Sequence, residues 1–349
     1  MIDSDDGRRP LLVAVALVVL AVVAAACAPG EEQAEPAPGD ESPVEEQQTP
    51  ADDASPAGDM EQVALRVGDV LGIPAAFLQY AVQEGFLQEQ GLDVEVEPNP
   101  GGAANIPGVE GGDFEIAGSN VVSVLLARGQ GLGVKMVSAG TFGGQDSESD
   151  FAQLLVAEDS PIREPADLDG KSIAINTLAN VAEVTTRASL ENAGAGHENI
   201  EFVEIGFPDM IPALQDDQVD AIFAIEPFLS VGLAQGLRPI IAPYAGTEPG
   251  MAVGSYFSSD AYIADNTDVV DRFIAGVTAA GDAVAEEPDA FREALVDLAD
   301  LDPEVAQSVN LPEWGGPVDT ESVQLTGDLM VRYGLLDEVP PLEDVVYQP

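Results

Sequence analysis

Basic residues are scarce in this sequence. It has 12 lysines and arginines against 63 aspartates and glutamates, so its formal net charge is −51. A surface this acidic repels the phosphate backbone of nucleic acids and anionic lipid headgroups, which excludes nucleic acid as a partner. We interpret the acidity as a means of staying soluble at high ionic strength, and it indicates little about a ligand.

Cysteine and histidine are nearly absent as well. The single cysteine, Cys27, excludes an internal disulfide, and one histidine leaves no cluster that could form a zinc site. That histidine, His197, lies in a loop that leads into a strand, where it cannot serve as the base of a Ser–His–Asp triad. The sequence therefore predicts no metal, no cofactor and no enzymatic activity.

The N-terminus has the pattern of a signal peptide. Arg8 and Arg9 precede an aliphatic stretch, 11–26, that is too short to span a bilayer comfortably. The letters "VAAAC" resemble the processing box of bacterial lipoproteins, which implies cleavage before Cys27 and a lipid on its thiol. A plain secretory peptide with an incidental cysteine remains an alternative. "GRRPLLV" partly matches a twin-arginine signal, so the export route stays open.

A tether is expected after the cysteine. Residues 27–62 are rich in glutamate, aspartate and proline, and contain no basic and no aromatic residue. Such a segment cannot bury enough apolar surface to fold, so we predict a disordered spacer that holds a globular part away from the membrane.

From residue 63 onward the chain alternates between strand and helix patterns. Apolar stretches with helical spacing, such as 75–86 and 121–129, separate many of the strands, and the chain after 258 is mostly helical. This alternation predicts an α/β fold with mainly parallel sheets. The expected strands are 63–70, 92–99, 114–120, 134–140, 151–157, 172–176, 200–206, 219–225, 238–243 and 254–259.

Four motifs in this part resemble one family. They read "PAAFLQYAVQEGFLQEQGLDVEVEPN", "IPGVEGGDFEIAGSN", "EPADLDGKSIAI" and "IPALQDDQVDAIFAIEPF". Their order and spacing are similar to those of substrate-binding proteins of ABC importers, in the nitrate/sulfonate/taurine and thiamine-pyrimidine-precursor (SsuA/Thi-like) superfamily. The resemblance extends over about 63–335, nearly the whole globular part.

The resemblance implies the two-lobed type II periplasmic-binding-protein fold, with ligand in a cleft that closes by a hinge. Lobe one would comprise 63–140 and 252–349, and lobe two 141–251. It also implies a monomer on the outer face of the cytoplasmic membrane, whose partners are a small-molecule ligand, an ABC permease and an ATPase.

Candidate site residues follow the expected strands, because ligands bind outside the carboxyl ends of strands in open α/β sheets. Each has a structural alternative: helix core for Phe77, a simple turn for Gly102, and helix capping for Ser119 and Asn120. The candidates are Leu71, Phe77, Gly102, Ala103, Ser119, Asn120, Asn176, Thr177, Asn180, Phe207, Glu226, Phe228 and Tyr256.

Glu226 carries the argument about ligand charge. It ends the strand 219–225 and precedes Pro227, so it either caps the next helix or faces the cleft. No candidate loop contains lysine or arginine, and a second negative charge beside Glu226 would be unfavourable. We therefore expect a nitrogenous heterocycle resembling a thiamine precursor, with aliphatic sulfonate, taurine or nitrate as the alternative.

Two other classes of protein share features with this sequence. The same fold includes an enzyme branch that makes the thiamine pyrimidine with pyridoxal phosphate, but that chemistry needs a lysine and histidines. The globular part has only Lys135, Lys171 and His197, so this activity is not expected. A tethered ligand sensor would share the anchor and the fold and would differ only in its partner.

Overall fold

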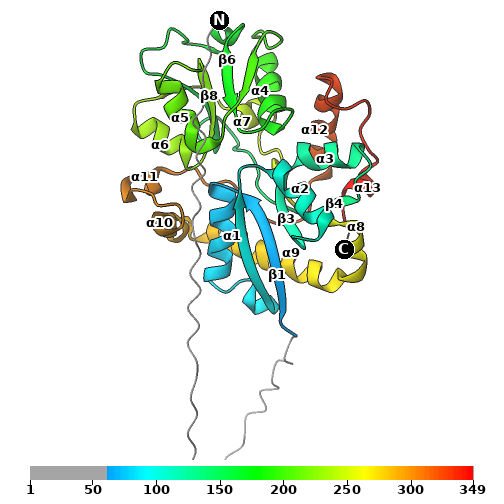
Figure 1. Cartoon of the computed structure of the whole chain (residues 1–349). Coiled ribbons are helices and arrows are strands. Elements are labelled where there is room, and N and C mark those ends of the chain that lie inside the picture. Colours follow the sequence, from blue (N-terminus) through cyan, green and yellow to red (C-terminus); the bar gives the residue numbers. More distant parts are fainter. Residues whose placement is uncertain (1–60, 349) are drawn as a thin grey trace, which may run out of the picture. The chain divides into compact units, whose positions relative to one another are not determined.

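The computed structural model describes residues 61–348. Cys27, the expected leader 1–26 and all but the last two residues of the expected tether lie outside this range. Within it, two five-stranded sheets are surrounded by helices (Figure 1). The α/β prediction is confirmed, and each of the ten expected strand stretches contains an observed strand.

The first sheet has the strand order β2-β1-β3-β10-β4. Strands β2, β1 and β3 are parallel to one another, whereas β10 runs antiparallel between β3 and β4. The strands are β1 (Val63–Val70), β2 (Leu92–Asn99), β3 (Ile116–Asn120), β4 (Val134–Ala139) and β10 (Gly254–Ser259).

The second sheet has the order β7-β6-β8-β5-β9. Here β5 runs antiparallel between β8 and β9, so each sheet has one antiparallel strand among four that share a direction, and the expectation of mainly parallel sheets is confirmed. The strands are β5 (Ala152–Val156), β6 (Ser172–Ile175), β7 (Glu201–Glu204), β8 (Ala221–Ile225) and β9 (Arg238–Ile241).

Two crossing connections join the sheets, and they lie side by side. Gly140 donates its N–H to Gly254 O, Val253 donates to Thr141 O, and Gly143 donates to Met251 O, each at 2.9 Å. The chain thus passes from β4 to β5 and returns from β9 to β10 along one hydrogen-bonded ribbon. The bounds that we expected for the lobes remain a prediction.

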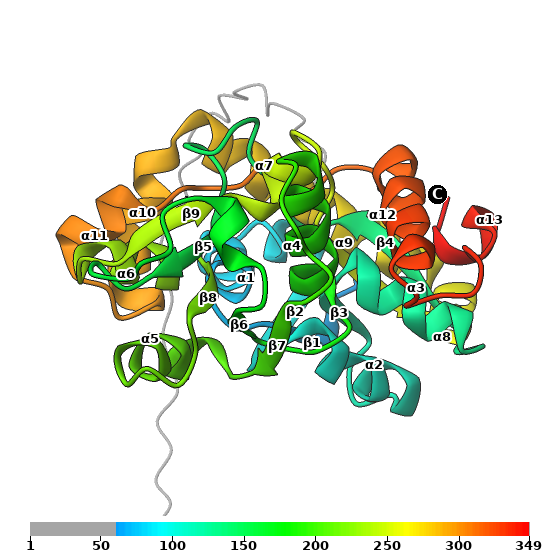
Figure 2. The same cartoon turned by 90° about the horizontal axis from the view of Figure 1, so that it is seen from above.

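The helices pack on the faces of the sheets, and α12 lies beside α3 in Figure 2. Asn120 and Asn180 begin α3 and α4 as N-caps. The helices are α1 (Ile73–Gln83), α2 (Gly102–Gly111), α3 (Val121–Gly129), α4 (Val181–Asn192), α5 (Phe207–Gln215), α6 (Phe228–Ala234), α7 (Pro243–Thr247), α8 (Asp260–Asp265), α9 (Thr267–Glu286), α10 (Pro288–Leu298), α11 (Pro303–Ser308), α12 (Thr320–Arg332) and α13 (Leu342–Val345). None of the described helices has the length and apolar character needed to cross a membrane.

Candidate functional site

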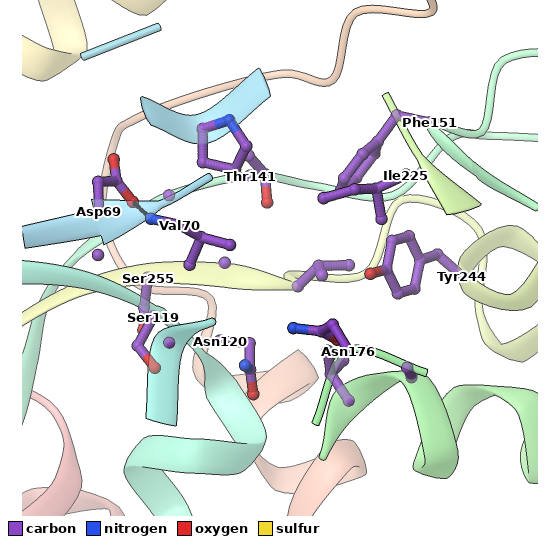
Figure 3. A pocket seen from close by; sticks show the side chains of 18 of the residues that line it. Asp69, Val70, Ser119, Asn120, Thr141, Phe151, Asn176, Ile225, Tyr244 and Ser255 are labelled. Carbon is purple, nitrogen blue, oxygen red and sulfur yellow. Dashed lines mark hydrogen bonds between the residues drawn. The ribbon is translucent and has the colours of Figure 1, made fainter. Parts of the chain in front are cut away.

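A cavity lies between the two sheets, at the carboxyl ends of several strands. Its interior has a volume of about 60 Å³, enough for a few waters or a small ligand. In Figure 3, Asp69, Ser119 and Ser255 lie toward one side of the view and Phe151, Ile225 and Tyr244 toward the other. The lining residues are Asp69, Val70, Pro74, Gly102, Gly118, Ser119, Asn120, Gly140, Thr141, Phe151, Asn176, Val181, Ala182, Phe207, Phe223, Ile225, Tyr244, Val253, Gly254, Ser255, Tyr256 and Trp314.

Direct contacts join the two halves beside the cavity and at a distance from it. The Ile73 N–H at the start of α1 donates to Glu226 O at 3.1 Å. Asn176 Nδ2, after β6, donates to Pro100 O at 3.4 Å. At the ends of α12 and α4, Tyr333 Oη donates to Glu191 Oε2 at 2.9 Å, beside an ion pair between Arg332 and the same carboxylate. The lobes are therefore in contact around the cavity.

The candidates chosen from the sequence divide into two sets. Those that line the cavity are Gly102, Ser119, Asn120, Asn176, Phe207 and Tyr256. Those that do not are Leu71, Phe77, Ala103, Thr177, Asn180, Glu226 and Phe228. Leu71 and Phe228 border a second groove, of about 460 Å³, between α1 and α6. Asn180 is buried as the cap of α4, where its Oδ1 accepts the Val181 N–H.

Phe77 belongs to the core but supports the cavity wall. Its ring stacks on Trp314 with 4.6 Å between centroids and an interplanar angle of 7°. Phe291 meets the same indole edge-on at 5.5 Å. Trp314 is thereby held in one orientation against the cavity, although it lies far along the chain from the other lining residues.

Glu226 occupies the capping role, one of the two roles that the sequence left open. Its carboxylate accepts the Ser230 N–H of α6 at 3.1 Å, the Ser230 hydroxyl at 2.9 Å and the Asn310 N–H at 3.0 Å. The residue is 1% exposed, and burial raises the pKa of this carboxyl to about 7. The carboxyl that does line the cavity belongs to another residue.

That residue is Asp69, near the end of β1, which we did not predict. Its Oδ1 accepts the Val70 N–H at 2.7 Å, and the Tyr256 hydroxyl donates to Oδ2 at 3.4 Å. Gly118 on the neighbouring strand leaves room for it, because any side chain there would collide with the carboxyl. Asp69 is 2% exposed, and burial raises its pKa to about 7.

A sequence signal for Asp69 exists. Side chains alternate between the faces of a strand, so Asp69 shares a face with Leu65 and Val67, both of which are buried. An aspartate in an inward-facing series at the carboxyl end of a strand indicates a site.

Three buried polar atoms around the cavity have no hydrogen-bond partner among the described residues. They are the hydroxyls of Ser119 and Ser255 and the indole nitrogen of Trp314. Such groups are costly to bury unless something satisfies them. A ligand with donors and acceptors at this position would supply the missing partners.

The described residues bring no lysine or arginine to the cavity lining. In two helices that reach it, one N–H of the first turn already has a side-chain partner. Asn120 Oδ1 accepts the Ser123 N–H of α3, and Asn180 Oδ1 accepts the Val181 N–H of α4. The start of α2, by contrast, has no side-chain cap.

The chain is similar to known proteins in sequence family and in structure. Residues 74–291 match the family model described as NMT1/THI5 like, and no curated protein sequence matches. The periplasmic aliphatic sulphonate binding protein SsuA from Escherichia coli has a TM-score of 0.67 at 21% identity, over 82% of this chain and 92% of that one. The alkanesulfonate-binding protein SsuA from Xanthomonas axonopodis pv. citri, bound to MOPS, gives 0.69 at 19% identity, over 82% and 97%.

An enzyme also has this fold. The desulfurization enzyme DSZB matches with a TM-score of 0.57 at 16% identity, over 82% of this chain and 96% of that one. Identities this low establish the fold alone. The predicted two-lobed periplasmic-binding-protein fold is confirmed.

Proposed function

Because this chain belongs to the NMT1/THI5-like family, we propose that it is a solute-binding protein that captures a small molecule by hinge closure and delivers it to an ABC import permease. One observation carries the proposal: Ser119, Ser255 and Trp314, each with a buried polar atom that lacks a hydrogen-bond partner, all line a single cavity between the lobes. A bound solute would satisfy them and favour the closed form, and opening would release it.

The protein would act from the outer face of the cytoplasmic membrane. The lipid on Cys27 would anchor it, and residues 28–62 would form the tether to the binding domain. It would work as a monomer, with the permease and its ATPase as partners and without nucleic acid.

A nitrogenous heterocycle of the thiamine-precursor type is our first choice of ligand. Aromatic side chains from both halves line the cavity, including Phe207, Tyr244 and Tyr256, and they offer surfaces on which a flat ring can pack. The amides of Asn120 and Asn176 supply both donors and acceptors for ring nitrogens and their substituents.

An aliphatic sulfonate, taurine or nitrate is the second choice. The uncapped N-terminus of α2 at Gly102 supports it, since free backbone N–H groups at a helix start bind anions. The relatives that bind sulfonates share only the fold with this chain. A tethered sensor without a permease would use the same cavity. No catalytic role is proposed, because His197 does not line the cavity.

Intrinsic fluorescence can be used to follow binding in the cavity. Trp314 is the one tryptophan of the chain, so intrinsic fluorescence comes from the cavity wall. We expect a saturable change when the full-length protein in detergent is titrated with its ligand, and mass spectrometry of small molecules released on denaturation identifies that ligand. Deleting the gene should abolish uptake of the same compound. A protein that releases no compound and responds to neither heterocycles nor sulfonates would not be a solute-binding protein.

A further inference from the structure

Asp69 is the one acidic residue among the side chains that line the cavity in the described part of the chain. No lysine or arginine accompanies it there, and its near neighbours are the Val70 N–H and the Tyr256 hydroxyl. The carboxyl is thus buried beside an empty space without a positive partner. A buried carboxylate in this situation is strongly destabilised relative to water unless a cation joins it.

The Asp69 carboxyl itself disfavours an anion beside it. Asn120 and Asn180 cap the N-termini of α3 and α4, and the Val121 N–H donates to Val253 O at 3.0 Å. These particular donors already have protein partners, whereas the start of α2 at Gly102 has no side-chain cap. A ligand anion close to Asp69 would add repulsion between like charges in a site of low dielectric constant.

The remaining lining suits a small cation. Tyr256 and Trp314 are among the residues that line the cavity, and aromatic rings attract organic cations. The Ser119 and Ser255 hydroxyls lack partners and can accept hydrogen bonds from N–H groups. With a volume of about 60 Å³, the cavity admits a compact group rather than a long chain.

We infer that Asp69 selects the charge of the ligand, and that the solute presents a protonated nitrogen, of an amine or an amidine, to the Asp69 carboxylate. This inference rests on the proposed solute-binding function and specifies which class of solute the site takes. Asp69, on a different strand, thus has the role of contacting the ligand that we expected of Glu226.

The pH dependence of binding follows from the same geometry. Asp69 has a pKa of about 7 without ligand, and the other titratable group facing it is Tyr256 on β10, whose pKa is raised well above its ordinary value. Between pH 6 and pH 8, Asp69 therefore ionises while Tyr256 stays neutral. A cation that remains protonated over this range should bind about tenfold more tightly at pH 8 than at pH 6.

The test uses Trp314 fluorescence on the full-length protein with probes of both charges. Guanidinium and acetamidinium, which stay protonated at both pH values, are compared with methanesulfonate and nitrate at pH 6 and pH 8. Asp69→Asn keeps the shape of the side chain and should weaken binding of the best cationic probe about a hundredfold and remove its pH dependence. Asp113→Asn makes the same chemical change at an exposed position on the same lobe and should behave as the wild type.

The outcomes separate the two proposals. Methanesulfonate or nitrate binding more tightly than every cationic probe, and more tightly at pH 6, would overturn the role of Asp69 and leave solute binding intact. An unchanged affinity for cations in Asp69→Asn would do the same. If Asp69→Asn does not fold, the wild type alone provides the test. Cation binding that is not tighter at pH 8 than at pH 6 would then overturn the role of Asp69. Failure of every probe to bind, with no ligand co-purifying, would overturn both.

Discussion

At the scale of single residues, two buried carboxyls fill the two roles, helix capping and facing the cavity, that we considered for Glu226 alone. Glu226 holds Ser230 and Asn310 together, and Asp69 faces the cavity. Strand patterns place both side chains at the ends of buried strands. They do not tell which one turns toward the cleft, because a partner 84 residues away, Asn310, orients Glu226.

Glu226 should make stability depend on pH. Its pKa is about 7 in the folded protein against an ordinary value of 4.5, so the folded state binds its proton more tightly than the unfolded state. Its contribution is fully present below the ordinary value and is lost as pH rises through 7, by about 3 kcal/mol. In Glu226→Gln the loss of stability between pH 5 and pH 8 should be smaller by up to this amount.

Urea denaturation followed by Trp314 fluorescence measures the effect. Asp69 and Asp150, whose pKa values are raised in the same direction, contribute equally to both proteins and cancel in the comparison. Asp113→Asn serves as the control and should follow the wild type. Parallel stability curves for Glu226→Gln and the wild type would show that burial does not raise this pKa.

At the scale of elements, the strands and their mainly parallel arrangement were predictable, but the antiparallel direction of β5 and β10 was not. The strands are short runs, either apolar or alternating between apolar and polar residues, and such runs are recognisable locally. The antiparallel placement of β5 and β10 follows from the crossing connections, which return the chain to a sheet from the opposite side. Trp314 was missed for a related reason: it reaches the cavity through a bridge to Thr141 that no local pattern reveals.

The crossing ribbon requires glycine where its two strands touch. A Cβ on Gly140 would lie 2.8 Å from both Gly254 C and Ser255 N, which are backbone atoms that cannot move aside individually. We therefore expect Gly140→Ala to lower the free energy of unfolding by about 1–3 kcal/mol. Gly111→Ala is the control, since a Cβ there meets only Asp113 Oδ2 at 3.9 Å. Equal stability of the two variants in urea denaturation would contradict this view of the ribbon.

At the scale of the whole molecule, charge dominates. A net charge of −51 generates repulsion throughout the folded chain, which salt weakens. Raising NaCl from 0.1 to 1 M shortens the Debye length from about 10 to about 3 Å. The melting temperature should rise by about 3–6 °C.

Thermal denaturation at each salt concentration measures this rise in melting temperature. The same series at pH 4.5, where many carboxylates are protonated, should show a smaller rise in melting temperature. A melting temperature that is constant or falls with salt at neutral pH would mean that the acidic residues are dispersed widely enough not to repel one another.

Trp314 lies late in the sequence, and this position has a consequence for biosynthesis. A nascent chain that has emerged as far as residue 300 already contains every strand of both sheets, since β10 ends at Ser259. It still lacks the Asn310 N–H that binds Glu226 and the indole that walls the cavity. Both sheets can therefore form before the pocket is finished, and the cavity wall is complete only when the last tenth of the chain has been made.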